Sequence, residues 1–139
     1  MRMSRERRRN RPCADYLTGR YPDVVKSIQE SPPDDLCLSS VVMAELRYGA
    51  EKSLRKRLNH DLLDTLARDV RCIDFDLDGA RTYGALRAAL ERRGSPLGPY
   101  DMMIAAHALS LGLIVVTDNE REFRRVKSLQ VENWRDRQR

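Results

Sequence analysis

The sequence predicts an α/β fold built on a mostly parallel sheet. From Tyr16 onward, segments with helical spacing of apolar residues alternate with short apolar segments suited to strands. The segment Leu113–Val116 is apolar throughout and rich in β-branched residues, which is typical of a parallel strand covered on both faces. The length of 139 residues, 41% of them hydrophobic, suits one compact domain with a single core.

The first half of the chain shows the order helix, strand, helix. Apolar residues share one helical face in Asp23–Glu30, and the two prolines that follow end this helix. Leu36–Leu38 is a short strand candidate. Ser39 or Ser40 can cap the next helix, Val41–Ala50, because a serine hydroxyl accepts a hydrogen bond from a free amide at a helix start.

The second half continues this alternation. Two of its helices end at Gly94 and Gly112, and glycine is a usual C-terminal stop. In an open parallel sheet, chemistry gathers at the carboxyl ends of the strands, so a site is expected there. The expected elements are helices over Arg55–Asp69, Leu77–Arg93, Tyr100–Leu111 and Glu120–Phe123, and strands over Val70–Phe75, Leu113–Val116 and Leu129–Glu132.

The excess positive charge is concentrated at the start of the chain. The net charge is +5, and residues 1–12 hold six arginines and one glutamate, which leaves 20 basic and 20 acidic residues elsewhere. We expect a basic, unstructured tail over 1–12, a domain over 13–134 and a charged tail over 135–139. A basic arm can bind nucleic acid through phosphates. A tail without function, or a misplaced start of the reading frame, explains the pattern equally well.

The cysteines and the lengths of the apolar runs indicate where in the cell the protein is located. Cys13, Cys37 and Cys72 are odd in number, lack metal-site spacing and follow no secretory signal, so we expect free thiols in the cytoplasm. No apolar run approaches the roughly 20 residues that a membrane-spanning helix needs. Walker-A, dinucleotide-binding, serine-hydrolase and zinc-protease motifs are absent from the sequence, so those enzyme classes have no support.

Three acidic residues occupy positions where a purely structural sequence rarely places them. Glu45 lies among apolar and small residues of a predicted helix, although pairing with Arg47 would also explain it. Asp101 opens the most apolar helix, where the dipole favours a carboxylate, and simple capping is the alternative. Asp118 follows an apolar strand at its carboxyl end, where an Asp-Asn turn is the alternative.

Together, these carboxylates predict a metal site. Oxygen ligands that converge from separate elements on one end of a sheet suit hard divalent cations, Mg²⁺ or Mn²⁺. Such an ion activates water and neutralises charge at a phosphodiester. The histidines, His60 and His107, share no ligand spacing with a cysteine, and His107 on its apolar helix is expected to be a packing residue.

Three further segments, Ser39–Gly49, Gly98–Ala108 and Val115–Phe123, follow one another in the order of motifs known from one family. They resemble the second-helix, central and late-strand motifs of the VapC-type PIN-domain ribonuclease toxins. Leu129–Trp134 is similar to the closing strand of that family. The resemblance extends over Tyr16–Trp134.

The resemblance implies a three-layer α/β/α fold and a Mg²⁺- or Mn²⁺-dependent endoribonuclease toxin of a type II toxin–antitoxin system. It also implies an RNA substrate, a cognate VapB-type antitoxin, a homodimer and a cytoplasmic protein without membrane contact. By motif match, Glu45, Asp101 and Asp118 are the catalytic, metal-binding acids. In many relatives the third acid falls one position later, where this chain has Asn119.

The start of the chain departs from the family pattern. Relatives open with an apolar strand that ends in a metal-binding Asp, whereas counting back from Cys13–Pro22 places Arg9 at that position. An arginine run cannot form a buried central strand without prohibitive cost. We therefore expect the first strand to be missing or disordered and nuclease activity to be weak or absent. Three explanations stay open: a misassigned or frameshifted start, loss of catalysis with partner binding retained, and replacement of the missing ligand by Asp15.

Other functions also fit the sequence. One is a catalytically inactive homologue that binds antitoxin or nucleic acid only. Another is a basic-tailed, non-catalytic nucleic-acid-binding module, which the aromatic content of 6% and the lack of a stacking motif make weaker. A generic α/β domain whose acids only cap helices is the remaining alternative.

Overall fold

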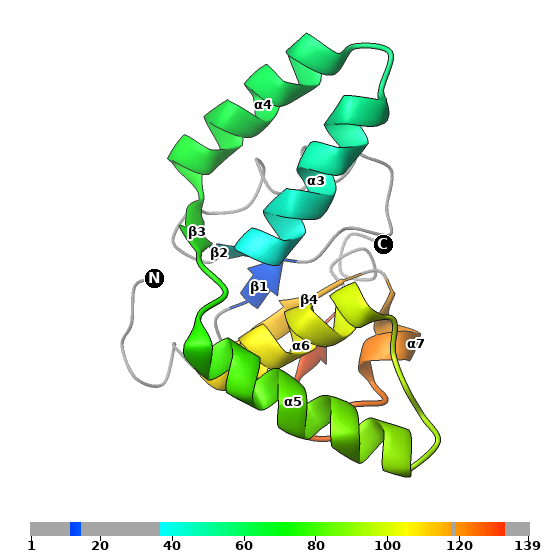
Figure 1. Cartoon of the computed structure of the whole chain (residues 1–139). Helices are drawn as coiled ribbons and strands as arrows, with labels where there is room; N and C mark the ends of the chain where they lie inside the picture. Colours follow the sequence, from blue (N-terminus) through cyan, green and yellow to red (C-terminus); the bar gives the residue numbers. More distant parts are fainter. Residues whose placement is uncertain (1–11, 15–36, 118, 133–139) are drawn as a thin grey trace.

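The computed structural model describes residues 12–14, 37–117 and 119–132. The helix expected over Asp23–Glu30, the expected tail over 135–139 and all but Pro12 of the expected tail over 1–12 lie outside these ranges. Within them, no helix is both long and apolar enough to cross a bilayer. The elements in Figure 1 are β1 (Pro12–Ala14), β2 (Cys37–Ser39), α3 (Ser40–Lys52), α4 (Lys56–Asp69), β3 (Arg71–Ile73), α5 (Leu77–Arg92), α6 (Pro99–Leu111), β4 (Ile114–Val116), α7 (Glu120–Phe123) and β5 (Val131–Glu132).

The strands form one five-stranded parallel sheet in the order β3-β2-β1-β4-β5. This confirms the expected α/β fold with a parallel sheet. Strand β4 is buried along its whole length, as its apolar composition predicts. All five carboxyl ends therefore meet at one edge of the sheet, and the helices that follow β2 and β4, α3 and α7, begin there.

Strand β1 corrects the expectation that a first strand is missing. Pro12–Ala14 pairs with β2 on one side and with β4 on the other, so it occupies the centre of the sheet. The three residues are uncharged and follow the arginine run, so this position in the sheet is filled without an arginine. The strand also begins one residue before the domain boundary expected at residue 13.

The helices lie in two pairs. Figure 1 shows α3 and α4 projecting as an antiparallel pair from one end of the molecule, whereas α5 and α6 lie side by side at the other end. Helix α6 ends at Gly112, whose φ of 67° is a left-handed conformation that glycine adopts without strain. The core joins both pairs to the sheet through fully buried side chains, which include Leu38, Val42, Leu63, Ile104, Val115 and Phe123.

A buried polar bridge connects the start of α3 with α6. Ser39 Oγ accepts the backbone N–H of Val41 at 3.1 Å, which caps α3, and lies 2.8 Å from His107 Nδ1. Because that oxygen already accepts from Val41, its hydroxyl proton can be donated to Nδ1. Burial lowers the pKa of His107, so the ring is neutral near pH 7. The edge of the Phe75 ring packs on it with centroids 5.4 Å apart, which confirms His107 as a packing residue.

We expect Ser39→Ala to destabilise the protein. The change removes the cap of α3 and leaves a buried imidazole nitrogen unsatisfied, which should lower the free energy of unfolding by about 1–3 kcal/mol. Urea unfolding measures this. Ser128→Ala, at an exposed position, is the matched control and should leave the midpoint unchanged. Equal midpoints for the two variants would show that the bridge contributes nothing.

Candidate functional site

Helix α3 positions Glu45 close to the core without burying it. The helix begins after Ser39, whose side chain caps it. Its buried face consists of Val41, Val42, Leu46 and Ala50. Glu45 lies at the border of that face and is half-buried. The sequence left open a pairing of Glu45 with Arg47, but Arg47 instead contacts Asp64 at 2.6 Å.

Helix α6 places Asp101 in its first turn. Gly98 is the N-cap, Pro99 opens the helix, and Asp101 is half-buried beside the buried Met102. A carboxylate that merely capped the helix would be stabilised in its charged form by the dipole. Here burial raises the pKa of Asp101 above its usual range, and the carboxylates of Glu122 and Glu45 raise it further. Burial and these two carboxylates therefore act against the charged form, in the opposite direction to the dipole.

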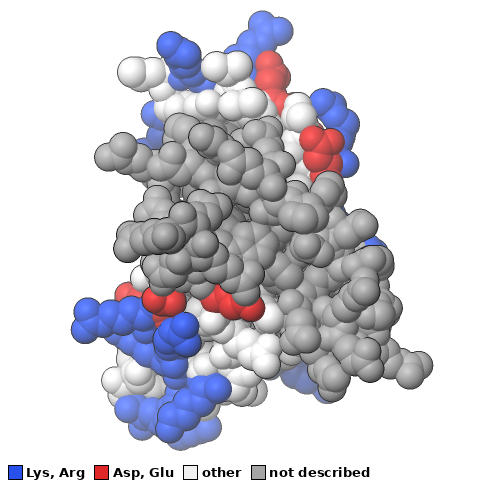
Figure 2. All heavy atoms as spheres, turned by 180° about the vertical axis from the view of Figure 1, so that it is seen from behind, with Lys and Arg blue, Asp and Glu red and all other residues white. Residues whose placement is uncertain are grey.

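Glu45 of α3 and Glu122 of α7 thus lie near enough to Asp101 of α6 to raise its pKa, and we call these three residues the acid cluster. Figure 2 shows acidic side chains gathered on the face that is turned away in Figure 1. Glu122 is not among the acids predicted from the sequence. The available signal was its place four residues after Asp118, in the short helix that follows β4 at the carboxyl edge of the sheet.

The third predicted acid, Asp118, lies outside the described residues. Its neighbours show how β4 leads into α7: Thr117 is buried, and its Oγ accepts the backbone N–H of Asn119 at 2.9 Å. The chain therefore turns at this point and enters α7, which carries Glu122.

The chemistry of the acid cluster fits a divalent cation. Half-buried carboxylates that repel one another gain most from a hard cation, because the ion removes the repulsion and replaces the lost solvation. Among the residues that the structure describes, no three acidic, histidine or cysteine side chains stand close enough to share an ion. A full set of protein ligands would thus need a residue outside 12–14, 37–117 and 119–132.

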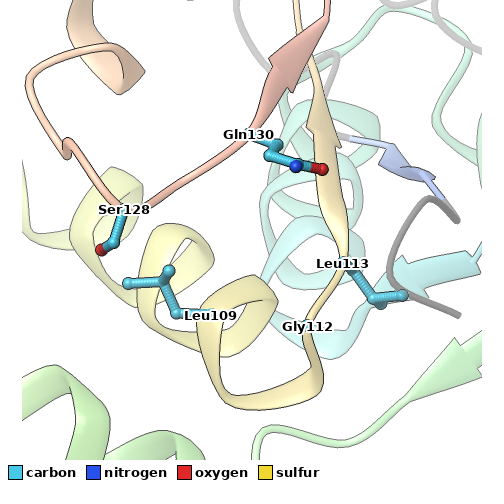
Figure 3. Close-up of a pocket in the computed structure, with 5 residues that line it drawn as sticks. All are labelled: Leu109, Gly112, Leu113, Ser128 and Gln130. Carbon is cyan, nitrogen blue, oxygen red and sulfur yellow. The ribbon is translucent and has the colours of Figure 1, made fainter. Parts of the chain in front are cut away.

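A shallow pocket lies elsewhere. Leu109, Gly112, Leu113, Ser128 and Gln130 line a hollow of about 230 Å³ (Figure 3). Gly112 and Leu113 precede β4, so the pocket is at the amino end of that strand, whereas the turn into α7 is at its carboxyl end. None of its lining residues is acidic, and the pocket is separate from the acid cluster.

Comparisons with known proteins identify the family. The PIN domain family matches residues 17–129. The chain is 46% identical over 99 residues to the tRNA(fMet)-specific endonuclease VapC of Salmonella typhimurium, a match that covers 71% of this chain and 75% of that protein. It is 36% identical over 121 residues to Ribonuclease VapC2 of Rickettsia felis, which covers 86% of this chain and 90% of that protein.

A solved structure agrees with these matches. The fold is similar to a chain in the crystal structure of DNA-bound VapBC from Salmonella typhimurium, with a TM-score of 0.77 and 36% identity, over 89% of this chain and 98% of that one. Sequence and fold therefore lead to the same conclusion: this chain belongs to the PIN-domain family and, within it, to the VapC-type ribonucleases.

Proposed function

We propose that this chain is a Mg²⁺- or Mn²⁺-dependent endoribonuclease, the toxin of a type II toxin–antitoxin system. The observation that carries the proposal is the acid cluster, in which half-buried Asp101 of α6 has a raised pKa because of burial and the nearby carboxylates of Glu122 and Glu45. The relatives from Salmonella and Rickettsia are named as an endonuclease and a ribonuclease, which supports RNA as the substrate.

In this proposal, Asp101 and Glu45 bind the metal ion, with Asp118 as a third ligand. The ion supplies an activated water and neutralises charge at the scissile phosphate. Glu122, which the sequence did not select, adds negative charge beside Asp101 and strengthens attraction for the cation. The half-buried position of Asp101 keeps its carboxylate poorly solvated, so a bound cation would stabilise it more than it would an exposed acid.

The proposed partners follow from the structural relatives. The similar Salmonella chain comes from a VapBC complex bound to DNA, which supports a cognate VapB-type antitoxin for this chain. We also propose a homodimer and a cytoplasmic location, as the family resemblance implies. The exposed side chains on the projecting α3–α4 pair, among them Tyr48, Leu54 and Leu58, are available for such contacts.

The position of β1 is relevant to the metal-binding Asp that ends the first strand of the relatives and that this chain lacks at the aligned position. The strand ends at Ala14 and is central in the sheet, and Asp15 is the next residue in the sequence. Asp15 itself lies outside the described residues, and it stays one of the open explanations because sites in parallel sheets form near the carboxyl ends of strands. The second candidate function remains an inactive homologue that binds antitoxin only, as expected if Arg9 occupies the ligand position.

We expect RNA cleavage that requires Mg²⁺ or Mn²⁺ and falls by at least about 100-fold in Asp101→Asn and Glu45→Gln, because each change removes charge that holds the ion. Cleavage of a labelled RNA with and without EDTA measures this. Asp61→Asn, an exposed acid on α4, is the matched control and should keep full activity.

The same assay separates the alternatives. Loss of cleavage in Asp15→Asn would support Asp15 as the replacement ligand. An inactive wild-type chain that binds its antitoxin as tightly as Asp101→Asn does would instead establish the binding-only function.

We expect metal-free Asp101→Asn to be more stable than the wild type near pH 7. Because the folded-state pKa of Asp101 is raised, its ionisation opposes folding above that pKa. As the pH falls through the raised pKa, the carboxyl binds a proton and the penalty disappears. The advantage of the variant should therefore shrink as the pH approaches the ordinary carboxyl range, near about 4. Urea unfolding across this pH range measures it.

Metal should invert this order. Saturating Mg²⁺ or Mn²⁺ stabilises the folded state that binds it, so the wild type should gain stability and Asp101→Asn should not. The control Asp61→Asn should follow the wild type under both conditions. If Asp101→Asn is less stable than the wild type at pH 7 without metal, the proposed repulsion in the acid cluster is contradicted.

A further inference from the structure

A group of basic side chains lies beside the acid cluster, and the proposed chemistry does not use it. Figure 2 shows Lys and Arg side chains next to acidic ones on the face that is turned away in Figure 1. We name as the basic shelf a set of exposed basic residues at the end of α5, on α7 and in the segment after α7. Its members are Arg92, Arg93, Arg121, Arg125 and Lys127.

Two hydrogen bonds hold the basic shelf together. The Arg93 guanidinium donates to the carbonyl of Arg125 at 3.1 Å, and the Arg125 guanidinium donates to the carbonyl of Pro96 at 2.9 Å. These bonds join the end of α5, the segment after α7 and the loop that precedes α6. The same loop leads into α6, whose first turn carries Asp101, five residues after Pro96 in the sequence.

The described part of the chain leaves the charge of the basic shelf unbalanced. No member forms an ion pair with an acid in the described ranges, whereas Arg87 and Arg124, its neighbours on α5 and after α7, are paired with Glu91 and Glu120. Keeping unpaired cations together costs free energy through self-repulsion. A polyanion that binds across them would remove that cost.

We propose that the basic shelf binds phosphates of the RNA strand on one side of the scissile bond, so that the substrate leaves the acid cluster over α7 and the end of α5. The proposal rests on the proposed function in taking RNA as the substrate. Guanidinium groups oriented by backbone carbonyls still have free N–H groups for phosphate oxygens. On the α3–α4 pair, by contrast, Arg47 and Lys56 are already bound to Asp64 and Glu51.

The test compares two double variants of the full chain in the Asp101→Asn background, which prevents cleavage. Arg121→Gln with Lys127→Gln removes two charges of the basic shelf and leaves its hydrogen bonds in place. Arg57→Gln with Arg81→Gln removes two exposed charges from α4 and from the opposite end of α5. Fluorescence anisotropy measures binding of a labelled single-stranded RNA over a series of salt concentrations. Urea unfolding checks that both variants fold.

The shelf variant should bind RNA more weakly at every salt concentration below the physiological one. The slope of log K against log salt should become shallower by about 1.4, since each phosphate contact on a single strand contributes roughly 0.7. The control pair should leave the slope unchanged. The arginine-rich start of the chain is the same in all variants, so its contribution to binding cancels in the comparison.

Several outcomes would overturn the proposal. Equal losses in the two variants would mean that total charge matters and the location does not. Unchanged RNA binding with weakened antitoxin binding would make the basic shelf a protein-binding surface. In the chain that keeps Asp101, RNA cleavage with an unaltered KM in the shelf variant would contradict the role of the basic shelf but not the nuclease function.

The opposite result separates the two proposals. If the chain that keeps Asp101 does not cleave RNA but the shelf variant still binds RNA more weakly, the nuclease function is contradicted and the role of the basic shelf is supported.

Discussion

The buried contact between Ser39 and His107 sets the relative position of the two helices that carry the candidate acids. Ser39 ends β2 and caps α3, whereas His107 lies within α6. Glu45 lies six residues beyond Ser39, and Asp101 lies six residues before His107. The bridge therefore ties the start of the helix that carries Glu45 to the helix that carries Asp101, and breaking it would cost a buried hydrogen bond.

Negative and positive side chains occupy different regions of this face. The acid cluster concentrates negative charge where α3, α6 and α7 meet, and the basic shelf concentrates positive charge over α7 and the end of α5. Under the proposed function, the acid cluster would hold a cation at the reacting phosphate and the basic shelf would bind neighbouring phosphates. Helix α7 links the two regions, since it contributes Glu122 to one and Arg121 to the other.

The central strand changes how the start of the chain is understood. Arginines cannot occupy a buried central strand, and the structure uses the uncharged residues after them instead. The sheet therefore keeps the strand order β2-β1-β4 that brings α3 and α7 to one edge. The basic shelf comes from α5, α7 and the segment after α7.

By itself, the sequence determined the alternation of elements, the Ser39 cap, the stop at Gly112 and the selection of Glu45 and Asp101, because these follow from local spacing, capping and motif order. Only the tertiary structure showed that Glu122 joins Asp101, that Arg47 pairs with Asp64 and not with Glu45, and that Arg93 and Arg125 join α5 to α7. These contacts join residues on different helices. Their partners depend on how the helices pack on the sheet, which periodicity along the chain does not encode.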